Sequence, residues 1–148
     1  MQNHKKYQSY LLVLVQFACI LVIIFTGRYY PLDMTASLLV IMAFYVGFWA
    51  ILSIPVKQLT IMPDYKEGSI LVVTGPYKYI RHPMYLAVLI FCLAMVINQF
   101  NIVRGVVFII LTVTLLFKIS YEEKQLLKGN PEYQSYKQKT KKLLPFIF

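Results

Sequence analysis

The sequence predicts an all-α, polytopic integral membrane protein with about four transmembrane helices and a C-terminal cytoplasmic helix. The chain of 148 residues is 59% hydrophobic and 14% charged, whereas an ordinary soluble domain is about 25% charged. Its apolar residues also fall into long runs, near the roughly 20 residues that a helix needs to cross a bilayer. The length suits a single domain, residues 1–148.

The first two expected membrane helices lie in the N-terminal part of the chain. Residues 10–26 form an apolar run in which only Gln16 is polar. A lysine pair precedes this run, but no small-residue cleavage site follows it, so we expect a retained helix rather than a cleaved signal peptide. The second helix is expected over 34–53, with Asp33 or Thr35 as its N-cap.

The connection 54–82 is polar and ends in an unusual stretch, GPYKYIRHPMY, at residues 75–85. A glycine–proline pair marks a turn. His82 precedes Pro83 and is expected to be extended, while a proline favours the first position of a helix. His82 therefore lies at the mouth of a new helix, where free backbone N–H groups attract an anion.

Two further apolar runs, 83–98 and 102–121, predict an antiparallel helical hairpin, because only a short polar turn separates them. The second of these helices is expected to continue beyond the membrane and to stop at Gly129. A last helix, 131–142, is expected to follow, since its start carries a proline and an acidic residue.

The cations predict the orientation of these helices. If both termini and the 54–82 connection lie on one side, every Lys and Arg except Arg28 and Arg104 lies there too. Such an asymmetry indicates the cytoplasmic side. The formal net charge of +9 is thus explained by membrane topology, and no nucleic acid partner is expected.

The remaining composition excludes several classes of site. Cys19 and Cys92 both lie in apolar runs, so we expect buried thiols rather than a disulfide. With two histidines in the chain, no zinc pattern is present and no metal site is expected. The glycines nowhere form G-x-G-x-x-G, which excludes a soluble nucleotide-binding fold of that type.

An acidic pair, Glu122 and Glu123, is expected on the same membrane face as Arg81 and His82. Two interpretations stay open for it: a salt bridge to Lys118 or Arg81, or a site in which one glutamate binds a cation. A glutamate together with an anion-attracting helix mouth would match an amino acid head group. The nearby tyrosines either offer π faces to a sulfonium or an adenine, or form an interfacial belt.

The stretch at 75–85, followed by Glu122-Glu123, Tyr133, Tyr136 and Leu144-Pro145, resembles the isoprenylcysteine carboxyl methyltransferase family. That family belongs to a wider group of membrane methyltransferases that includes the phospholipid N-methyltransferases. The resemblance covers roughly residues 55–148. It implies S-adenosylmethionine as methyl donor, bound on the cytoplasmic side within the 54–82 loop.

The resemblance also implies roles for particular residues. His82 and the helix start would hold the carboxylate of the donor, and Glu122 its ammonium. Lys118 stands where eukaryotic members carry an arginine that meets the substrate carboxylate, and arginine has a planar fork that lysine lacks. In the expected mechanism, Lys118 or Arg81 would steady the anionic head of the acceptor. The implied donor contacts are Ser69, Ile70, Leu71, Val72, Tyr77, His82, Pro83, Met84, Tyr85 and Glu122.

The function expected from these observations is methyl transfer to a lipophilic small molecule or lipid, through a carboxylate or another oxygen or sulfur nucleophile. The acceptor would enter from the bilayer, and helix 131–142 would act as a lid over the donor. Three alternatives stay open: a phospholipid N-methyltransferase, a nicotinamide-dependent sterol reductase, and a non-catalytic membrane subunit whose polar residues are interfacial anchors.

Overall fold

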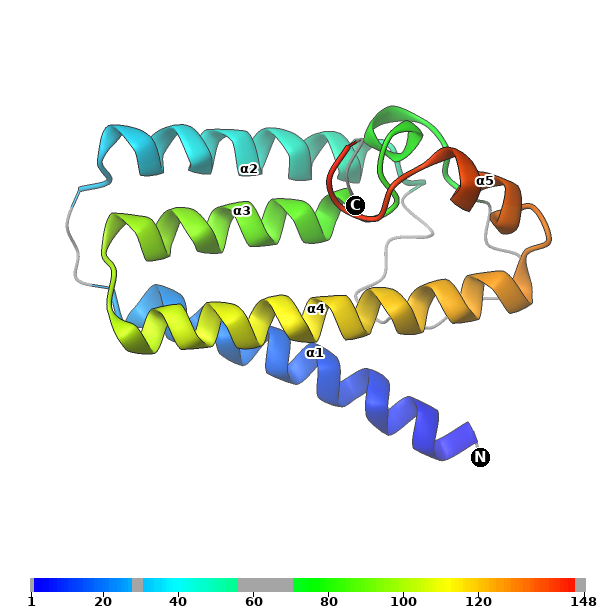
Figure 1. The fold of residues 1–148 in the computed structure, drawn as a ribbon, viewed down its shortest axis with the longest axis horizontal. Coiled ribbons are helices and arrows are strands. Elements are labelled where there is room, and N and C mark those ends of the chain that lie inside the picture. Colours follow the sequence, from blue (N-terminus) through cyan, green and yellow to red (C-terminus); the bar gives the residue numbers. More distant parts are fainter. Residues whose placement is uncertain (1, 28–30, 56–70, 146–148) are drawn as a thin grey trace.

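The computed structural model describes residues 2–27, 31–55 and 71–145, with side chains from Tyr7 onward (Figure 1). The elements are α1 (Gln2–Phe25), α2 (Met34–Leu52), the short 3₁₀ helix η2 (Gly75–Lys78), α3 (Pro83–Asn98), α4 (Ile102–Gly129) and α5 (Tyr133–Lys139). Across the described residues the fold is all-helical, apart from one isolated bridge between Ile80 and Lys141.

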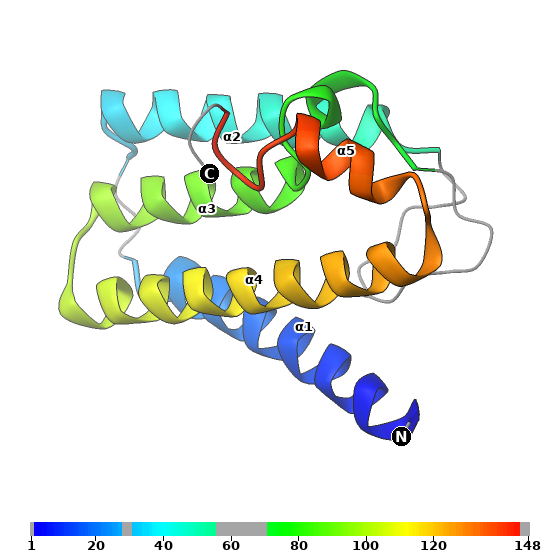
Figure 2. The same ribbon diagram turned by 45° about the vertical axis from the view of Figure 1, so that its right-hand side comes forward.

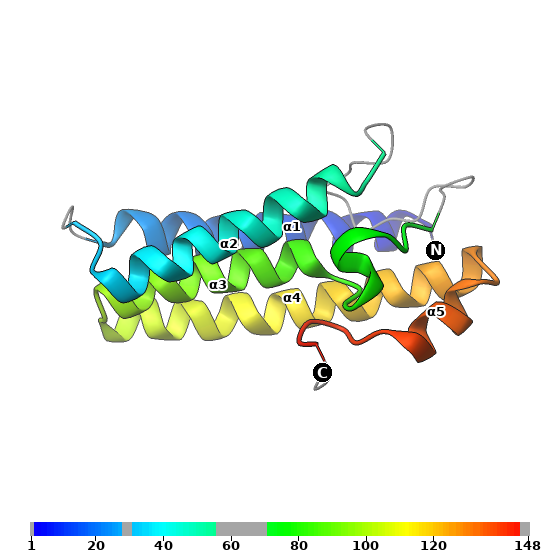
Figure 3. The same cartoon turned by 90° about the horizontal axis from the view of Figure 1, so that it is seen from above.

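The long helices pack as two pairs, α2 with α3 and α1 with α4. Figures 1 and 2 show α1 crossing α4 obliquely, so that its N-terminal end diverges from the bundle. In Figure 3, seen from above, the long helices run lengthwise and α5 lies beside the end of α4. The core between the pairs consists of Cys19, Ile23, Cys92, Val96, Leu111 and Leu115.

The segments Tyr7–Phe25, Met34–Leu52 and Ile102–Gly129 are long and apolar enough to cross a membrane, and α3 is a shorter apolar helix. Large hydrophobic side chains cover their outer faces; Ile41 and Phe44 of α2 are 65% and 66% exposed. Exposed apolar surface on this scale belongs in lipid rather than in water. The chain is therefore a multi-pass integral membrane protein, as the sequence predicted.

Several helix boundaries follow from local chemistry. Asp33, rather than Thr35, caps α2: its Oδ1 accepts the backbone N–H of Ala36 at 2.6 Å. Helix α4 continues to Gly129, as predicted, while α1 already begins at Gln2.

Helix α5 is shorter than the predicted 131–142, because the chain after it runs extended. Residues 140–142, the C-terminal strap, lie beside residues 79–82. The backbone N–H of Arg81 donates to the Lys141 carbonyl at 2.8 Å, and that of Lys141 to the Tyr79 carbonyl at 3.1 Å. These hydrogen bonds satisfy backbone groups that a longer helix would have paired internally.

The bundle has two ends with different polar contents. The site end holds the start of α3, the end of α4, α5 and the C-terminal strap, whereas the far end holds the start of α4 (Figure 1). At the far end, Arg104 is 2% exposed and donates through Nε and Nη2 to the Ile23 carbonyl, at 3.1 and 2.9 Å. It also donates to the Gln99 carbonyl. Arg104 thus ties the C-terminal end of α1 to the turn between α3 and α4.

Candidate active site

The stretch 75–85 turns sharply and then begins α3. Gly75 has φ 59°, and a Cβ there would lie 2.0 Å from the Ser53 hydroxyl oxygen, so only glycine fits this close approach. His82 is the N-cap of α3, with φ −127° and ψ 57°, and Pro83 is the first helical residue. His82 thus lies outside the helix and at its mouth, as predicted, but its ψ angle departs from the extended conformation that was expected before a proline.

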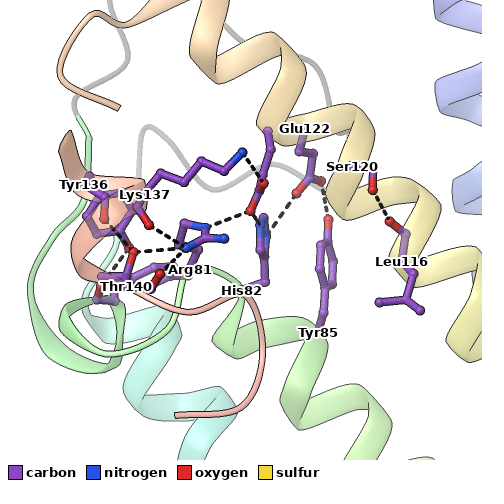
Figure 4. Close-up of polar contacts among 11 residues, drawn as sticks. Arg81, His82, Tyr85, Leu116, Ser120, Glu122, Tyr136, Lys137 and Thr140 are labelled. Atoms are coloured by element: carbon purple, nitrogen blue, oxygen red, sulfur yellow. Dashed lines mark hydrogen bonds and ion pairs between the residues drawn. The ribbon is translucent and has the colours of Figure 1, made fainter. Parts of the chain in front are cut away.

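Helix α4 brings its acidic pair to this mouth, from 42 positions away in the sequence (Figure 4). The His82 imidazole lies between the two carboxylates, with Nδ1 3.5 Å from Glu122 Oε2 and Nε2 3.5 Å from Glu123 Oε1. Arg81 Nε donates to Glu123 Oε1 at 2.7 Å. The Tyr85 hydroxyl donates to Glu122. The two glutamates therefore have different partners: Glu123 holds the arginine, and Glu122 faces the histidine and the tyrosine.

The His82 side chain is 93% buried and held in an acidic environment. Burial alone would lower its pKa, but the negative charges of Glu122 and Glu123, each 3.5 Å from a ring nitrogen, outweigh burial and raise the pKa above its ordinary value. The 3.5 Å contact of Nε2 with Glu123 is an ion pair and not a well-formed hydrogen bond, so this buried nitrogen has no hydrogen-bond partner in the structure. His82 is thus a buried imidazole whose positively charged form the two glutamates favour.

The C-terminal strap and α5 hold Arg81 from the other side. Its Nη1 donates to the Thr140 carbonyl, and to the Lys137 carbonyl at 3.2 Å. The ammonium of Lys137 lies 3.5 Å from Glu123 Oε2. Figure 4 shows this cluster beside the imidazole. Arg81 is therefore enclosed by Glu123, α5 and the strap.

Three tyrosines surround the same region. The Tyr136 hydroxyl donates to the Tyr77 carbonyl at 2.7 Å, which fastens α5 to η2. Burial raises the pKa of Tyr77 and of Tyr133, and it raises the pKa of Tyr136 to about 12. All three hydroxyls stay protonated at neutral pH, and the buried Tyr133 hydroxyl has no hydrogen-bond partner in the structure.

Lys118 extends the network toward α1. It is 1% exposed, and its Nζ lies 2.8 Å from Gln16 Oε1. The same nitrogen lies 5.1 Å from the ring centroid of Tyr85, a cation–π contact. The Tyr85 ring in turn stacks on His82, with centroids 5.6 Å apart and planes 8° apart. Lys118 is therefore joined to the site through the face of one aromatic ring.

The structure brings together Arg81, His82, Tyr85, Lys118 and Glu122, as the sequence predicted, and Tyr77 joins them through Tyr136. Of the other predicted donor residues, Pro83 and Met84 form the start of α3, directly after His82, and Leu71 and Val72 lie in the segment before η2. The predicted contacts at Ser69 and Ile70 lie outside the described residues, as does most of the 54–82 loop.

Sequence reasoning missed two features of the site. The first is Gln16; its only signal was that it is the one polar residue in an apolar run. The second is the pairing of Arg81 with Thr140 in the strap, for which the lysine-rich C-terminal segment gave no signal.

Residues 32–133 match the family model of the phospholipid methyltransferases. The matched range includes α2, α3, α4, and the polar residues from Arg81 to Glu123, while α1 and the C-terminal strap lie outside it. No curated protein gives a significant match.

Proposed function

The chain belongs to the phospholipid methyltransferase family, and we propose that it transfers the methyl group of S-adenosylmethionine to a lipophilic acceptor at the site end. That it is a membrane methyltransferase follows from the family and from its apolar helices. The observation that carries the finer proposal is the arrangement of the His82 imidazole and the α3 mouth opposite the Glu122 carboxylate.

The residues present fit the amino acid head group of the donor. A carboxylate has four lone-pair sites, and the contacts of Glu122 with Tyr85 and His82 leave capacity for an ammonium. The unsatisfied Nε2 of His82 and the N–H groups at the α3 mouth are donors suited to a carboxylate. The bound donor would supply an electrophilic methyl group on a sulfonium.

The chain's own residues mainly bind, orient and exclude water, because an anionic acceptor needs no base. We assign Lys118 to the anionic head of the acceptor, since this lysine is buried and its ammonium contacts the ring of Tyr85. Arg81, enclosed by Glu123 and the strap, positions His82 rather than touching the acceptor. The donor would enter from the cytoplasmic side, beneath α5 and the strap, because the exposed lysines gather there.

A second candidate acceptor is the amine of a phospholipid, which the name of the family favours. An amine must be neutral to attack, and Lys118 close to it would disfavour its protonated form. The two candidates differ in the product, which is a methyl ester, ether or thioether in the first case and a methylated amine in the second.

Calorimetric titration with S-adenosylhomocysteine tests the donor site. The purified protein should bind it, and Glu122→Ala and His82→Ala should each weaken binding by about tenfold or more, because each removes a charged partner of the head group. Glu132→Ala is the matched control, since this exposed glutamate lies away from the network. Unchanged affinity for S-adenosylhomocysteine in both site variants would contradict the assignment of the donor site.

Mass spectrometry of membrane lipids, with and without the protein, identifies the acceptor. A methyl-sized mass increase on a carboxylate, thiol or hydroxyl lipid supports the first candidate, and the same increase on an aminophospholipid supports the second.

A further inference from the structure

Helix α1 has a buried polar face that a membrane anchor does not need. Ser9 is 0% exposed and Gln16 7% exposed, and the two positions, seven residues apart, lie on one face with Ile23. Burying a polar group costs free energy unless it is hydrogen-bonded. An anchor would carry apolar residues at both positions.

Gln16 has a defined role on this face. Its side-chain oxygen accepts a hydrogen bond from Lys118 at 2.8 Å, although the residues are 102 positions apart. A lysine buried at membrane depth is costly and is held by polar partners. Because the same ammonium lies over the ring of Tyr85, whose hydroxyl donates to Glu122, a polar path runs from α1 to the donor site.

The register of α1 on α4 is fixed independently. Arg104 donates two hydrogen bonds to the Ile23 carbonyl, and Cys19 and Ile23 pack against Leu111 and Leu115 of α4. Gln16 therefore faces Lys118 because α1 is locked in place two turns further along. The Ser9 hydroxyl, buried without a hydrogen-bond partner in the structure, is a second polar group on the same face.

We propose that α1, which lies outside the matched range 32–133, completes the acceptor site, and that Gln16 is a positioning residue which fixes the Lys118 ammonium for the acceptor's anionic group. This inference rests on the function proposed above. It makes the contact between Gln16 and Lys118 a determinant of acceptor use rather than of donor binding.

The test replaces a glutamine on the buried face of α1 and, as a control, a glutamine on its exposed face. Gln16→Met removes the oxygen at similar length, and Gln8→Met makes the same change at an exposed position of α1. Each full-length variant is reconstituted with labelled S-adenosylmethionine and a lipid extract of the expression host as the acceptor probe. Three quantities are measured: the apparent kcat/KM for the extract, the affinity for S-adenosylhomocysteine, and the thermal midpoint.

We expect Gln16→Met to lower the apparent kcat/KM by about tenfold, since small displacements of a positioning group cost rate steeply. Affinity for S-adenosylhomocysteine should stay within about twofold of the wild type, and Gln8→Met should resemble the wild type throughout. A wild-type rate in Gln16→Met overturns the inference. So does a loss of rate matched by equal losses of donor affinity and midpoint, which would mean a structural role.

Gln16→Glu covers the case in which Gln16→Met does not fold. It keeps an oxygen beside Lys118 but adds a negative charge, so it should fold and still use an anionic acceptor poorly. Undiminished use of an anionic acceptor overturns the inference. If the wild type binds no S-adenosylhomocysteine, the proposed function is wrong. If the wild type binds S-adenosylhomocysteine but methylates nothing in the extract, both the proposal of a lipophilic acceptor and this inference are wrong.

Discussion

Two arginines are buried at opposite ends of the bundle, Arg81 at 8% exposure and Arg104 at 2%. Arg104 donates to the backbone carbonyls of Ile23 and Gln99, groups that never titrate. Arg81 donates to the carboxylate of Glu123 as well as to backbone carbonyls of the C-terminal segment. The far end is thus held by hydrogen bonds to backbone groups, whereas the site end contains carboxylates and an imidazole, which can change charge.

The N-caps show the same difference. At the far end, Asp33 and Asn101 use their side chains to cap α2 and α4, accepting from Ala36 and Arg104 at 2.6 and 2.9 Å. At the site end, the side chain of His82 turns from its own helix toward two carboxylates. The polar side chains at the far end hydrogen-bond to the backbone and stabilise the fold. Those at the site end contact one another and lie where a ligand could bind them.

The largest effect is expected from Arg81→Leu. It leaves Glu123 buried without its arginine and releases the strap, so the free energy of unfolding should fall by about 3–5 kcal/mol. Binding of S-adenosylhomocysteine should also be lost. Unfolding in detergent and calorimetry measure the two effects. A stable variant that still binds S-adenosylhomocysteine would show that neither the fold nor the donor site depends on Arg81.

Arg104→Leu should cost less and should spare the site. It leaves the buried carbonyl of Ile23 without the two N–H groups that Arg104 donates to it, at about 1–3 kcal/mol. The same unfolding assay should show a lower midpoint, while the affinity for S-adenosylhomocysteine stays at the wild-type level. A loss of affinity comparable to that of Arg81→Leu would end the distinction between the two ends.

Of the two ends as the described residues show them, the site end should make stability depend on pH near neutrality. Because Glu122 and Glu123 raise the pKa of His82 above its ordinary value of about 6.5, folding favours the imidazolium. This stabilisation is fully present below pH about 6.5 and is lost as the pH rises through the folded-state pKa. The thermal midpoint should therefore fall from pH 6.5 upward. His82→Gln should flatten this fall, and a variant with an unchanged slope would contradict the assignment.

The smallest effects compare one hydrogen bond from each end. Tyr136→Phe removes the bond to the Tyr77 carbonyl, and Asn101→Ala removes the cap of α4. Each should cost about 1 kcal/mol. Only Tyr136→Phe should also weaken S-adenosylhomocysteine binding, by a few-fold, because it loosens α5 over the site. Equal affinities in the two variants would argue against α5 as a lid.

What the sequence predicted well depends on neighbours along the chain. The placement of His82 followed from the proline after it, and the end of α4 followed from Gly129. The meeting of the α3 mouth with the acidic pair followed from the hairpin, since both lie at one end of it. Such inferences need only local preferences and one turn.

What the sequence did not predict depends on contacts between distant segments. Nothing local distinguishes Glu122 from Glu123, so only the packed structure shows which one holds Arg81. Gln16 and Lys118 meet because α1 crosses α4 at a particular register. The segment 140–142 was expected to be helical, yet pairing with residues 79–82 offers its backbone a better set of partners than one more helical turn.

The C-terminal strap also has a consequence for the order of events during synthesis. Arg81 cannot complete its contacts until Thr140 and Lys141 have been made, which follows the synthesis of α1 to α4. The membrane helices can therefore insert and pair while the site is still open. Assembly of the site end is therefore a late step, and a chain that stops before residue 140 would lack the contacts of the strap with Arg81.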